Sequence, residues 1–357
     1  MFPYFFSTVS RMMLPIRVGH SKPRNGSVTS MNRRHFLALS GASTITGFAK
    51  TSRTIEGVFP IAHTPFTASN EIDMETLAAE VRFLDKCGVQ GIVWPQLASE
   101  YFTLGDEERL AGVETILQAN KGLKPAVVVG VQSQNIETAK RFAVHAEKNG
   151  ADAIIAIPPK NASIEKFIDY YRQIGRACSL PLVVQAIGDV SVDDIIGMAK
   201  QVPTLAYVKD EAGFTPHRIT EFAKRAPQIK IFTGNHGQMF PDELHRGAVG
   251  TMPAGGFADL YVNVWELWRA GNRAQAMDEF ARANLFISEV KEYGVDSVKY
   301  ILELRGVFKN HLMRQRPAGG GEGKGTLDPI TKLDEPAKQY LAEVFRHITP
   351  YLRTGKS

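Results

Sequence analysis

Short apolar runs recur along the chain from residue 56 onward, and amphipathic stretches fill the gaps between them. Most of these runs are continuously hydrophobic rather than alternating, as expected for strands that are buried on both faces. They repeat every 20–35 residues or so, roughly the length of one strand–helix unit. The pattern predicts eight strands, at 57–65, 90–95, 125–131, 151–158, 181–187, 205–210, 229–234 and 248–253.

The gaps carry the hydrophobic period of helices that pack one face against a sheet. We predict such helices over 74–87, 136–148 and 164–177. Eight strand–helix units running in one direction predict an α/β protein with a (β/α)8 TIM barrel fold. A doubly wound open sheet is the alternative, but no Gly-x-Gly-x-x-Gly turn follows the first strand, which weakens a dinucleotide-binding interpretation.

The chain continues for about a hundred residues after the eighth predicted strand, which is more than a bare barrel needs. Helical patterns occupy 262–270, 273–290 and 297–313, and a glycine-rich loop at 318–325 leads to a last helix at 335–348. We therefore divide the chain into a leader at 1–50, a barrel at 55–260 and a C-terminal helical region at 261–350.

Charge is distributed unevenly along the chain. Residues 1–55 hold eight Lys and Arg but no Asp or Glu, which leaves 34 basic against 37 acidic residues, a net charge of −3, for 56–357. The overall charge of +5 thus comes from the leader. Residues 56–357 have no excess of basic residues of the kind that binds a nucleic acid.

The leader contains Arg33-Arg34-His35-Phe36-Leu37, followed by a stretch of small and apolar residues at 38–49. This pattern resembles a twin-arginine export signal, and the stretch is too short and too polar to span a membrane in the mature protein. Met31 precedes the arginine pair, so it is a candidate for the true start. We predict export to the periplasm; cytoplasmic or organelle targeting through an acid-free transit peptide is the alternative.

The two cysteines, Cys87 and Cys178, each lie near the end of a predicted helix. Two cysteines without metal-ligand spacing favour buried structural thiols over a disulfide or a metal site. We expect no metal and no cofactor.

Lys209 lies near the C-terminal end of the sixth predicted strand. In a barrel of this type the C-terminal ends of the strands form the active site. Burial favours the neutral amine of a lysine, which can then attack a carbonyl carbon and form a Schiff base. A solvated lysine at a strand end is the alternative interpretation.

The chain resembles the dihydrodipicolinate synthase / N-acetylneuraminate lyase family over roughly residues 55–350. Five stretches carry the resemblance in order: Thr64-Pro65-Phe66, the run 100–109, Gly130-Val131, the run 208–213 around Lys209-Asp210-Glu211, and the helix junction 270–276. The resemblance implies a barrel that acts on a 2-oxo acid or a related carbonyl substrate, with Lys209 as the Schiff-base lysine. It also implies association into homodimers or homotetramers.

The sequence departs from the family pattern at three strand ends. The family's Gly-Thr-Thr-Gly-Glu is replaced by Gln96-Leu97-Ala98-Ser99-Glu100, so both threonine hydroxyls are missing. Lys160 stands where the family's catalytic tyrosine follows the fourth strand, and the fifth strand ends without the family's Tyr-Asn-x-Pro. These departures favour a divergent member of the family.

Lys160 is our second candidate catalytic residue, because a lysine turned into the barrel mouth would favour the neutral form of Lys209 or hold a substrate carboxylate. A solvated loop lysine without a role is the alternative. Glu100, carried over from the family, is expected to support its loop by hydrogen bonds. The candidate substrate-binding residues are polar groups at the remaining strand ends: Ser99, Gln185, Asn235, His236 and Thr251. His236 is also a candidate proton carrier near neutral pH.

Two functions therefore compete. The first is a Schiff-base lyase of the aldolase or dehydratase type, which the lysine favours. The second is a non-catalytic or differently acting small-molecule-binding barrel, which the lost threonines and tyrosine favour. Fold alone does not separate them.

Overall fold

The predicted strands pair in parallel and form one eight-stranded sheet, in which β2 to β8 follow one another and β8 returns to β1. The structure is a computed structural model that describes residues 53–328 and 331–354; the predicted leader and its export signal lie outside these residues. The sheet closes because Ala62 N donates to Val93 O (3.0 Å) and Val93 N donates to Pro60 O (3.0 Å). The strands are β1 (Gly57–Val58), β2 (Gly91–Trp94), β3 (Ala126–Gly130), β4 (Ala153–Ala156), β5 (Leu182–Ala186), β6 (Leu205–Asp210), β7 (Lys230–Thr233) and β8 (Gly250–Thr251).

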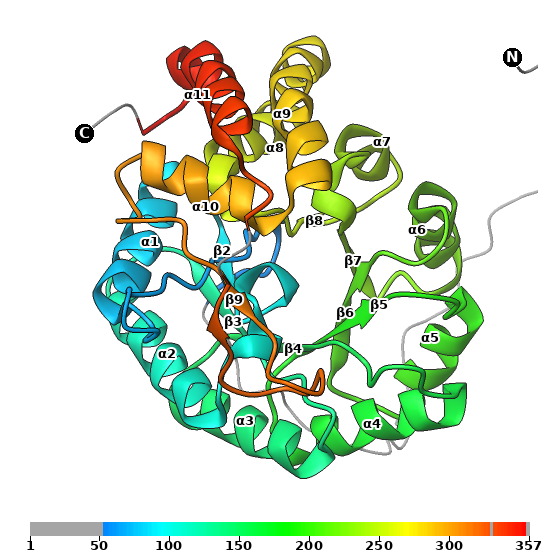
Figure 1. Ribbon diagram of the computed structural model, residues 1–357. Helices are drawn as coiled ribbons and strands as arrows, with labels where there is room; N and C mark the ends of the chain where they lie inside the picture. The colour runs from blue at the N-terminus through cyan, green and yellow to red at the C-terminus, as the bar shows by residue number, and fades with distance from the viewer. Residues whose placement is uncertain (1–52, 329–330, 355–357) are drawn as a thin grey trace, which may run out of the picture. The chain divides into compact units, whose positions relative to one another are not determined.

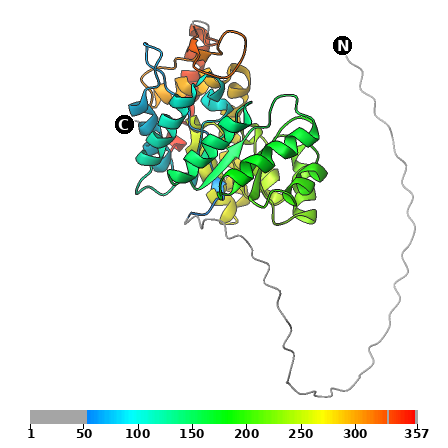
Figure 2. The same cartoon turned by 90° about the horizontal axis from the view of Figure 1, so that it is seen from below.

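A helix follows each strand and covers the outside of the sheet, so the predicted (β/α)8 barrel is confirmed (Figure 1). The view turned by 90° shows the same helices flanking the strands (Figure 2). The helices of the barrel are α1 (Met74–Cys87), α2 (Asp106–Ala119), α3 (Ile136–Lys148), α4 (Ile164–Ala177), α5 (Val192–Ala199), α6 (Thr215–Arg225), α7 (Phe240–His245) and α8 (Ala258–Arg269).

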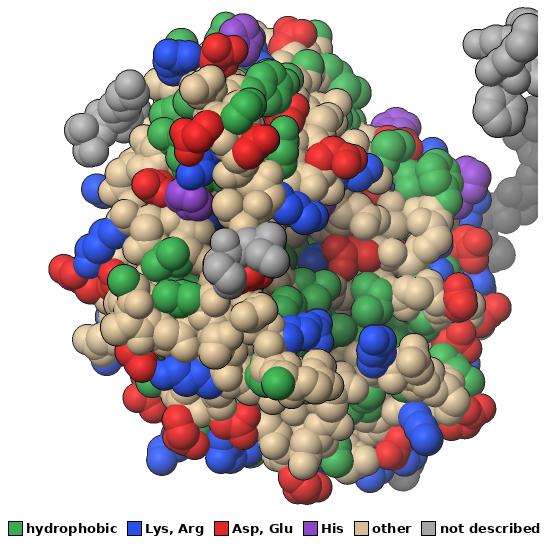
Figure 3. Space-filling view, in the orientation of Figure 1, with side chains coloured by type: hydrophobic (Ala, Val, Ile, Leu, Met, Phe, Trp, Pro, Cys, Tyr) green, Lys and Arg blue, Asp and Glu red, His purple; other side chains and the backbone are tan. Residues whose placement is uncertain are grey.

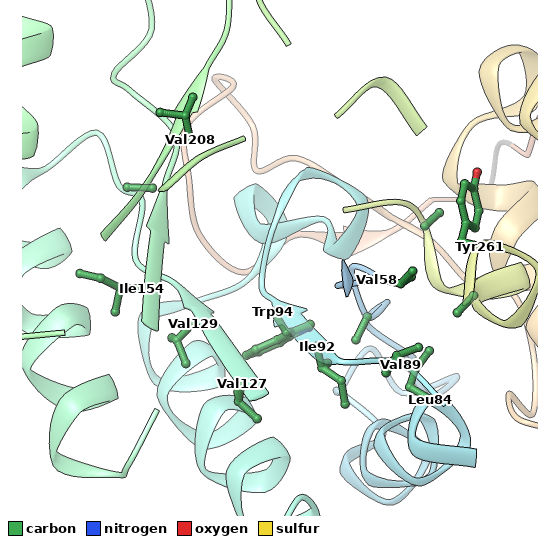
Figure 4. Packing of buried hydrophobic residues seen from close by; sticks show 14 of the residues in the cluster. Val58, Leu84, Val89, Ile92, Trp94, Val127, Val129, Ile154, Val208 and Tyr261 are labelled. Atoms are coloured by element: carbon green, nitrogen blue, oxygen red, sulfur yellow. The ribbon is translucent and has the colours of Figure 1, made fainter. Parts of the chain in front are cut away.

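Strand residues point alternately into the barrel and toward the helices, which divides the apolar core in two. Phe59, Val128 and Phe232 belong to a cluster built almost wholly from strand residues, which is the barrel interior. Their neighbours in sequence, such as Val127 and Val129, belong to the larger cluster shared with the helices (Figure 4). The strand sequences are continuously apolar because both of their faces are buried.

The C-terminal region adds α9 (Arg273–Tyr293), α10 (Val295–Leu304) and α11 (Glu335–Ile348), together with a hairpin of β9 (Arg314–Gln315) and β10 (Thr326–Leu327). The predicted helix at 297–313 was wrong beyond Leu304, because Gly306 adopts a left-handed φ of 70° and ends the helix. The hairpin was not predicted. The buried Arg314 holds it to the barrel by hydrogen bonds to Thr103 O (3.2 Å) and to both carboxylate oxygens of Glu108.

Cys87 and Cys178 are buried and unpaired. Burial raises the pKa of Cys87 to about 12 and that of Cys178 to about 11, so both remain protonated near neutral pH. Within the described residues, no helix combines the length and the apolar character that crossing a membrane requires.

Candidate active site

Lys209 lies inside the barrel near its C-terminal end, with 4% of its surface exposed. Val208 and Asp210 on either side of it point toward the helices, while Tyr207 and the register partner Phe232 pack in the interior. The alternation of β6 therefore directs the Lys209 side chain inward. Its ammonium nitrogen lies 3.2 Å from Oε1 of Glu211, which is two residues further along the chain.

Glu211 is held in place by groups from both neighbouring strands. Asn235 N donates to its Oε1 (3.0 Å), and the Gln185 amide donates to its Oε2. Gly234 leaves room for this carboxylate, because a Cβ at that position would lie only 2.0 Å from Cγ of Glu211. Burial raises the pKa of Glu211, but the charge of Lys209 and these hydrogen bonds outweigh burial and hold it below its usual value. These contacts fix the Glu211 carboxylate beside the Lys209 amine.

His236 lies in the loop after β7, where the backbone is strained. Asn235 and His236 both have left-handed φ values, of 48° and 56°, which side chains with a Cβ rarely adopt. The Tyr261 hydroxyl donates to His236 O (2.6 Å) and fixes the turn. Burial lowers the pKa of His236, and the positive charge of Lys209 lowers it further, so its imidazole is neutral at pH 7.

Gln185 is the third polar group beside Lys209. The two residues are register partners on β5 and β6, and Gln185 is fully buried. Its amide nitrogen binds Glu211, while its Oε1 has no hydrogen-bond partner among the described residues. A buried carbonyl oxygen without a donor is costly unless a ligand or water supplies one. Figure 3 shows the surface hollowed over these strand ends, with basic and acidic side chains in the hollow.

Ser99 and Glu100, in the loop after β2, are bound to groups other than Lys209. The Ser99 hydroxyl donates to Ala62 O (2.5 Å) and accepts from Gln96 N (3.0 Å). Both hydrogen bonds of this hydroxyl are therefore made with backbone groups of the protein. Glu100 forms a buried ion pair with Lys299 and accepts from Arg314 N (3.0 Å). These contacts tie the loop after β2 to the C-terminal region.

Thr251 lies in register with Val58, which belongs to the cluster shared with the helices. Since register partners point to the same side of a sheet, its side chain faces the helices rather than Lys209. Its hydroxyl lies 3.0 Å from where a Gly237 Cβ would be, beside Tyr261. The structure does not bring Thr251 to the Lys209 group.

Lys160 is exposed in the loop after β4. It lines a cavity of about 490 Å³ between the loops that follow β4 and β5, together with Phe167, Ile187 and Asp189. Lys209 is not among the lining residues of this cavity. The structure therefore leaves Lys160 exposed at this cavity, whereas Lys209 and Glu211 are not among the residues that line it.

Two features were missed from the sequence. The first is Glu211, which belongs to the 208–213 stretch but was not named as a site residue. Because side chains of a strand alternate every two residues, the sequence could have placed Lys209 and Glu211 on the same inner face. The buried pair of His63 and Glu80 had no such signal, because its members are 17 residues apart, on the first strand end and on a helix.

An eight-stranded barrel with buried polar groups gathered at the strand ends defines the class of (β/α)8 barrels built to act on small molecules. Within that class, the sequence matches the Dihydrodipicolinate synthetase family over residues 54–324, and the chain belongs to this family.

Curated relatives include an L-2-keto-3-deoxyarabonate dehydratase from Azospirillum brasilense, 26% identical, covering 82% of this chain and 94% of the relative. A 4-hydroxy-tetrahydrodipicolinate synthase from Rhizobium meliloti is 33% identical, covering 70% and 88%. Among solved structures, YagE from E. coli K12 in complex with pyruvate superimposes with a TM-score of 0.72 at 23% identity, covering 82% of this chain and 98% of YagE. The chain is thus a divergent member of a family of lyases and aldolases.

Proposed function

We propose that the protein is a Schiff-base lyase that acts on a 2-oxo acid, with Lys209 as the nucleophile. The observation that carries this proposal is the buried Lys209 amine inside the barrel, paired with Glu211 at 3.2 Å and with Gln185 beside it on the neighbouring strand. An interior lysine paired with a carboxylate can pass a proton to it and attack a carbonyl carbon.

In the proposed reaction the amine of Lys209 adds to carbon 2 of the oxo acid, and loss of water gives an imine. Removal of a proton from carbon 3 then moves an electron pair into an enamine. In a dehydration, the hydroxyl on carbon 4 then leaves as water. In an aldol cleavage, carbon 3 is not deprotonated: the hydroxyl on carbon 4 loses its proton, the bond between carbons 3 and 4 breaks to release an aldehyde, and the electron pair of that bond forms the enamine. His236 is our candidate for a proton carrier, because its neutral imidazole can accept a proton near pH 7.

Dehydration of a 2-oxo-3-deoxy sugar acid is the reaction that we favour. The 26% identity to an L-2-keto-3-deoxyarabonate dehydratase extends over nearly the whole of that relative, which supports this choice. Gln185 Oε1 is a free acceptor that could receive a substrate hydroxyl. We further propose that Lys160 binds an anionic end of the substrate, since an exposed amine serves better as a cation than as a proton relay. By the family resemblance, we propose that the protein associates into homodimers or homotetramers.

Turnover of 2-oxo-3-deoxy-pentonates tests this proposal. Product analysis by NMR separates loss of water from release of pyruvate, and either outcome identifies the lyase class. Lys209→Met should abolish both, while Lys200→Met, a change at an exposed lysine after α5, should leave turnover intact. Ligand binding by the wild type without any turnover would instead support the non-catalytic binding barrel, which the replaced threonines and tyrosine favour.

A further inference from the structure

A histidine–glutamate pair lies buried at the end of the first strand. His63 and Glu80 are both 0% exposed, and Nδ1 of His63 lies 3.2 Å from Oε1 of Glu80. The backbone N–H of His63 also donates to both carboxylate oxygens, at 3.1 and 2.9 Å. Glu80, on α1, is therefore held against His63 by three contacts.

The carboxylate fixes the tautomer of this histidine. In the neutral imidazole, a protonated Nδ1 donates to the carboxylate and the second ring nitrogen, Nε2, carries the lone pair. Nε2 is fully buried and has no hydrogen-bond partner among the described residues. Buried polar atoms without partners are rare in folded proteins and are often found where a function requires them.

The side chain of His63 faces the interior of the barrel. Phe59 and Ile61, at the two preceding alternate positions, belong to the interior cluster, while Ala62 belongs to the outer one. The alternation places His63 on the inner side of the barrel wall. Lys209 is likewise buried, with 4% of its surface exposed.

Electrostatics link the pair to the proposed site. The positive charge of Lys209 lowers the pKa of His236, and a proton on His63 would lower it further, so the three groups lie within electrostatic reach of one another. On its other side, Glu80 is one of the acidic groups that act on the buried ammonium of Lys299, which is paired with Glu100.

We propose that His63 is the base that moves the proton at carbon 3 of the substrate, with Glu80 as its positioning residue. This inference rests on the proposed function. In the protonated imine formed by Lys209, the Nε2 lone pair takes a proton from carbon 3. The electron pair of that C–H bond forms the carbon–carbon double bond of the enamine, and the imine nitrogen becomes neutral. The reverse step returns the proton.

Proton exchange isolates this step from the rest of the reaction. In D2O, the methyl protons of pyruvate exchange for deuterium only if an imine forms and a base then acts at carbon 3, and NMR measures the rate. Borohydride trapping of pyruvate, measured by intact mass, reports imine formation alone. The ratio of the deuterium exchange rate to the amount of trapped imine therefore measures how well the base works once the imine has formed. A purely structural role of His63 would leave that ratio unchanged.

His63→Asn is the sharpest variant, because the asparagine amide can keep the contact with Glu80 while Nε2 is lost. We expect trapping close to the wild-type level and exchange lowered by about 100-fold or more, the usual contribution of a general base. Glu80→Gln should also lower exchange, by about 10-fold, with trapping retained. The matched control is His145→Asn, which removes a histidine paired with Glu114 (3.4 Å) on the outer helices and should change neither rate.

Wild-type exchange in a His63→Asn protein that traps pyruvate would overturn this inference and leave the proposed function standing. Failure of the wild type to trap any 2-oxo acid would overturn the proposed function, and this inference with it. If His63→Asn does not fold, Glu80→Gln decides the matter, because exchange at the wild-type rate in that variant contradicts the role of the pair.

Discussion

Lys160 lies in the loop after β4 and Lys209 lies on β6, and the structure gives the two lysines different surroundings. Lys209 is buried and paired with Glu211, whereas Lys160 is exposed and lines a rim cavity. A nucleophilic amine must lose its proton, which burial favours, while an exposed amine keeps it. The chemistry assigned to each lysine follows from this difference.

Replacing Lys160 by methionine is expected to raise the Michaelis constant by about 5-fold, because one exposed charge contact to a carboxylate contributes roughly 1 kcal/mol. The maximal rate and its pH profile should stay the same. Steady-state kinetics across pH, with Lys166→Met as the control at a neighbouring position on α4, make the measurement. Loss of one limb of the pH profile would instead indicate proton transfer by Lys160.

At the scale of single residues, the sequence predicted the position of Lys209 but not its partners. The strand pattern alone placed the lysine at the end of β6. Thr251 was expected at the substrate site but faces the helices. The strand β8 has only two residues, Gly250 and Thr251, which are too few to read the alternation of side chains from the sequence. The pairing of His63 with Glu80 depends on how α1 packs against β1, which no local pattern encodes.

At the scale of elements, helices with a strong amphipathic period were predicted to the residue, as for α1, α3, α4 and α11. The hairpin of β9 and β10 escaped prediction, because each strand has two residues and its position depends on distant partners of Arg314. Short elements held by long-range contacts leave little trace in sequence.

Glu243, on α7, is a buried carboxyl group that contacts Thr215 of α6. Burial raises its pKa from 4.5 to about 7, although the Thr215 hydroxyl donates to it. Between these values the folded protein binds a proton that the unfolded chain has lost, so stability falls as pH rises through this window, and the cost is complete above pH 7.

Glu243→Gln fixes the neutral form and should therefore stabilise the protein at pH 8 by about 2–3 kcal/mol, with little effect near pH 4.5. Urea unfolding of both proteins at the two pH values is the measurement. Glu221→Gln, at an exposed position of α6, should change stability by less than about 0.5 kcal/mol at either pH. An equal effect of Glu243→Gln at both pH values would contradict the raised pKa.

At the scale of the whole molecule, the described residues already contain a closed barrel, with β1 bonded to β8 on one side and to β2 on the other. Removing residues 1–50 should therefore change the unfolding midpoint by less than about 2 °C, because no strand or helix of the barrel is lost. Calorimetry of the two proteins tests this. A fall of more than about 5 °C would show that the leader contributes packed structure.

The leader itself is predicted to act as an export signal. Exchanging Arg33 and Arg34 for lysine keeps the charge but removes the arginine pair that the export machinery recognises, so the protein should remain in the cytoplasm. Cell fractionation of a bacterial host measures the distribution. Exchanging Arg17 and Arg24 for lysine is the matched control, and export that survives the Arg33/Arg34 change would refute the twin-arginine interpretation.

The central claim is that Lys209 forms the Schiff base, and the site of a reduced pyruvate adduct tests it most directly. The protein is treated with pyruvate and borohydride, digested, and the modified peptide is sequenced by mass spectrometry. We predict that the adduct lies on Lys209 alone, that it is absent from Lys209→Met, and that it persists in Lys200→Met. An adduct on Lys160 instead, or the absence of any adduct across a panel of 2-oxo acids, would contradict the claim.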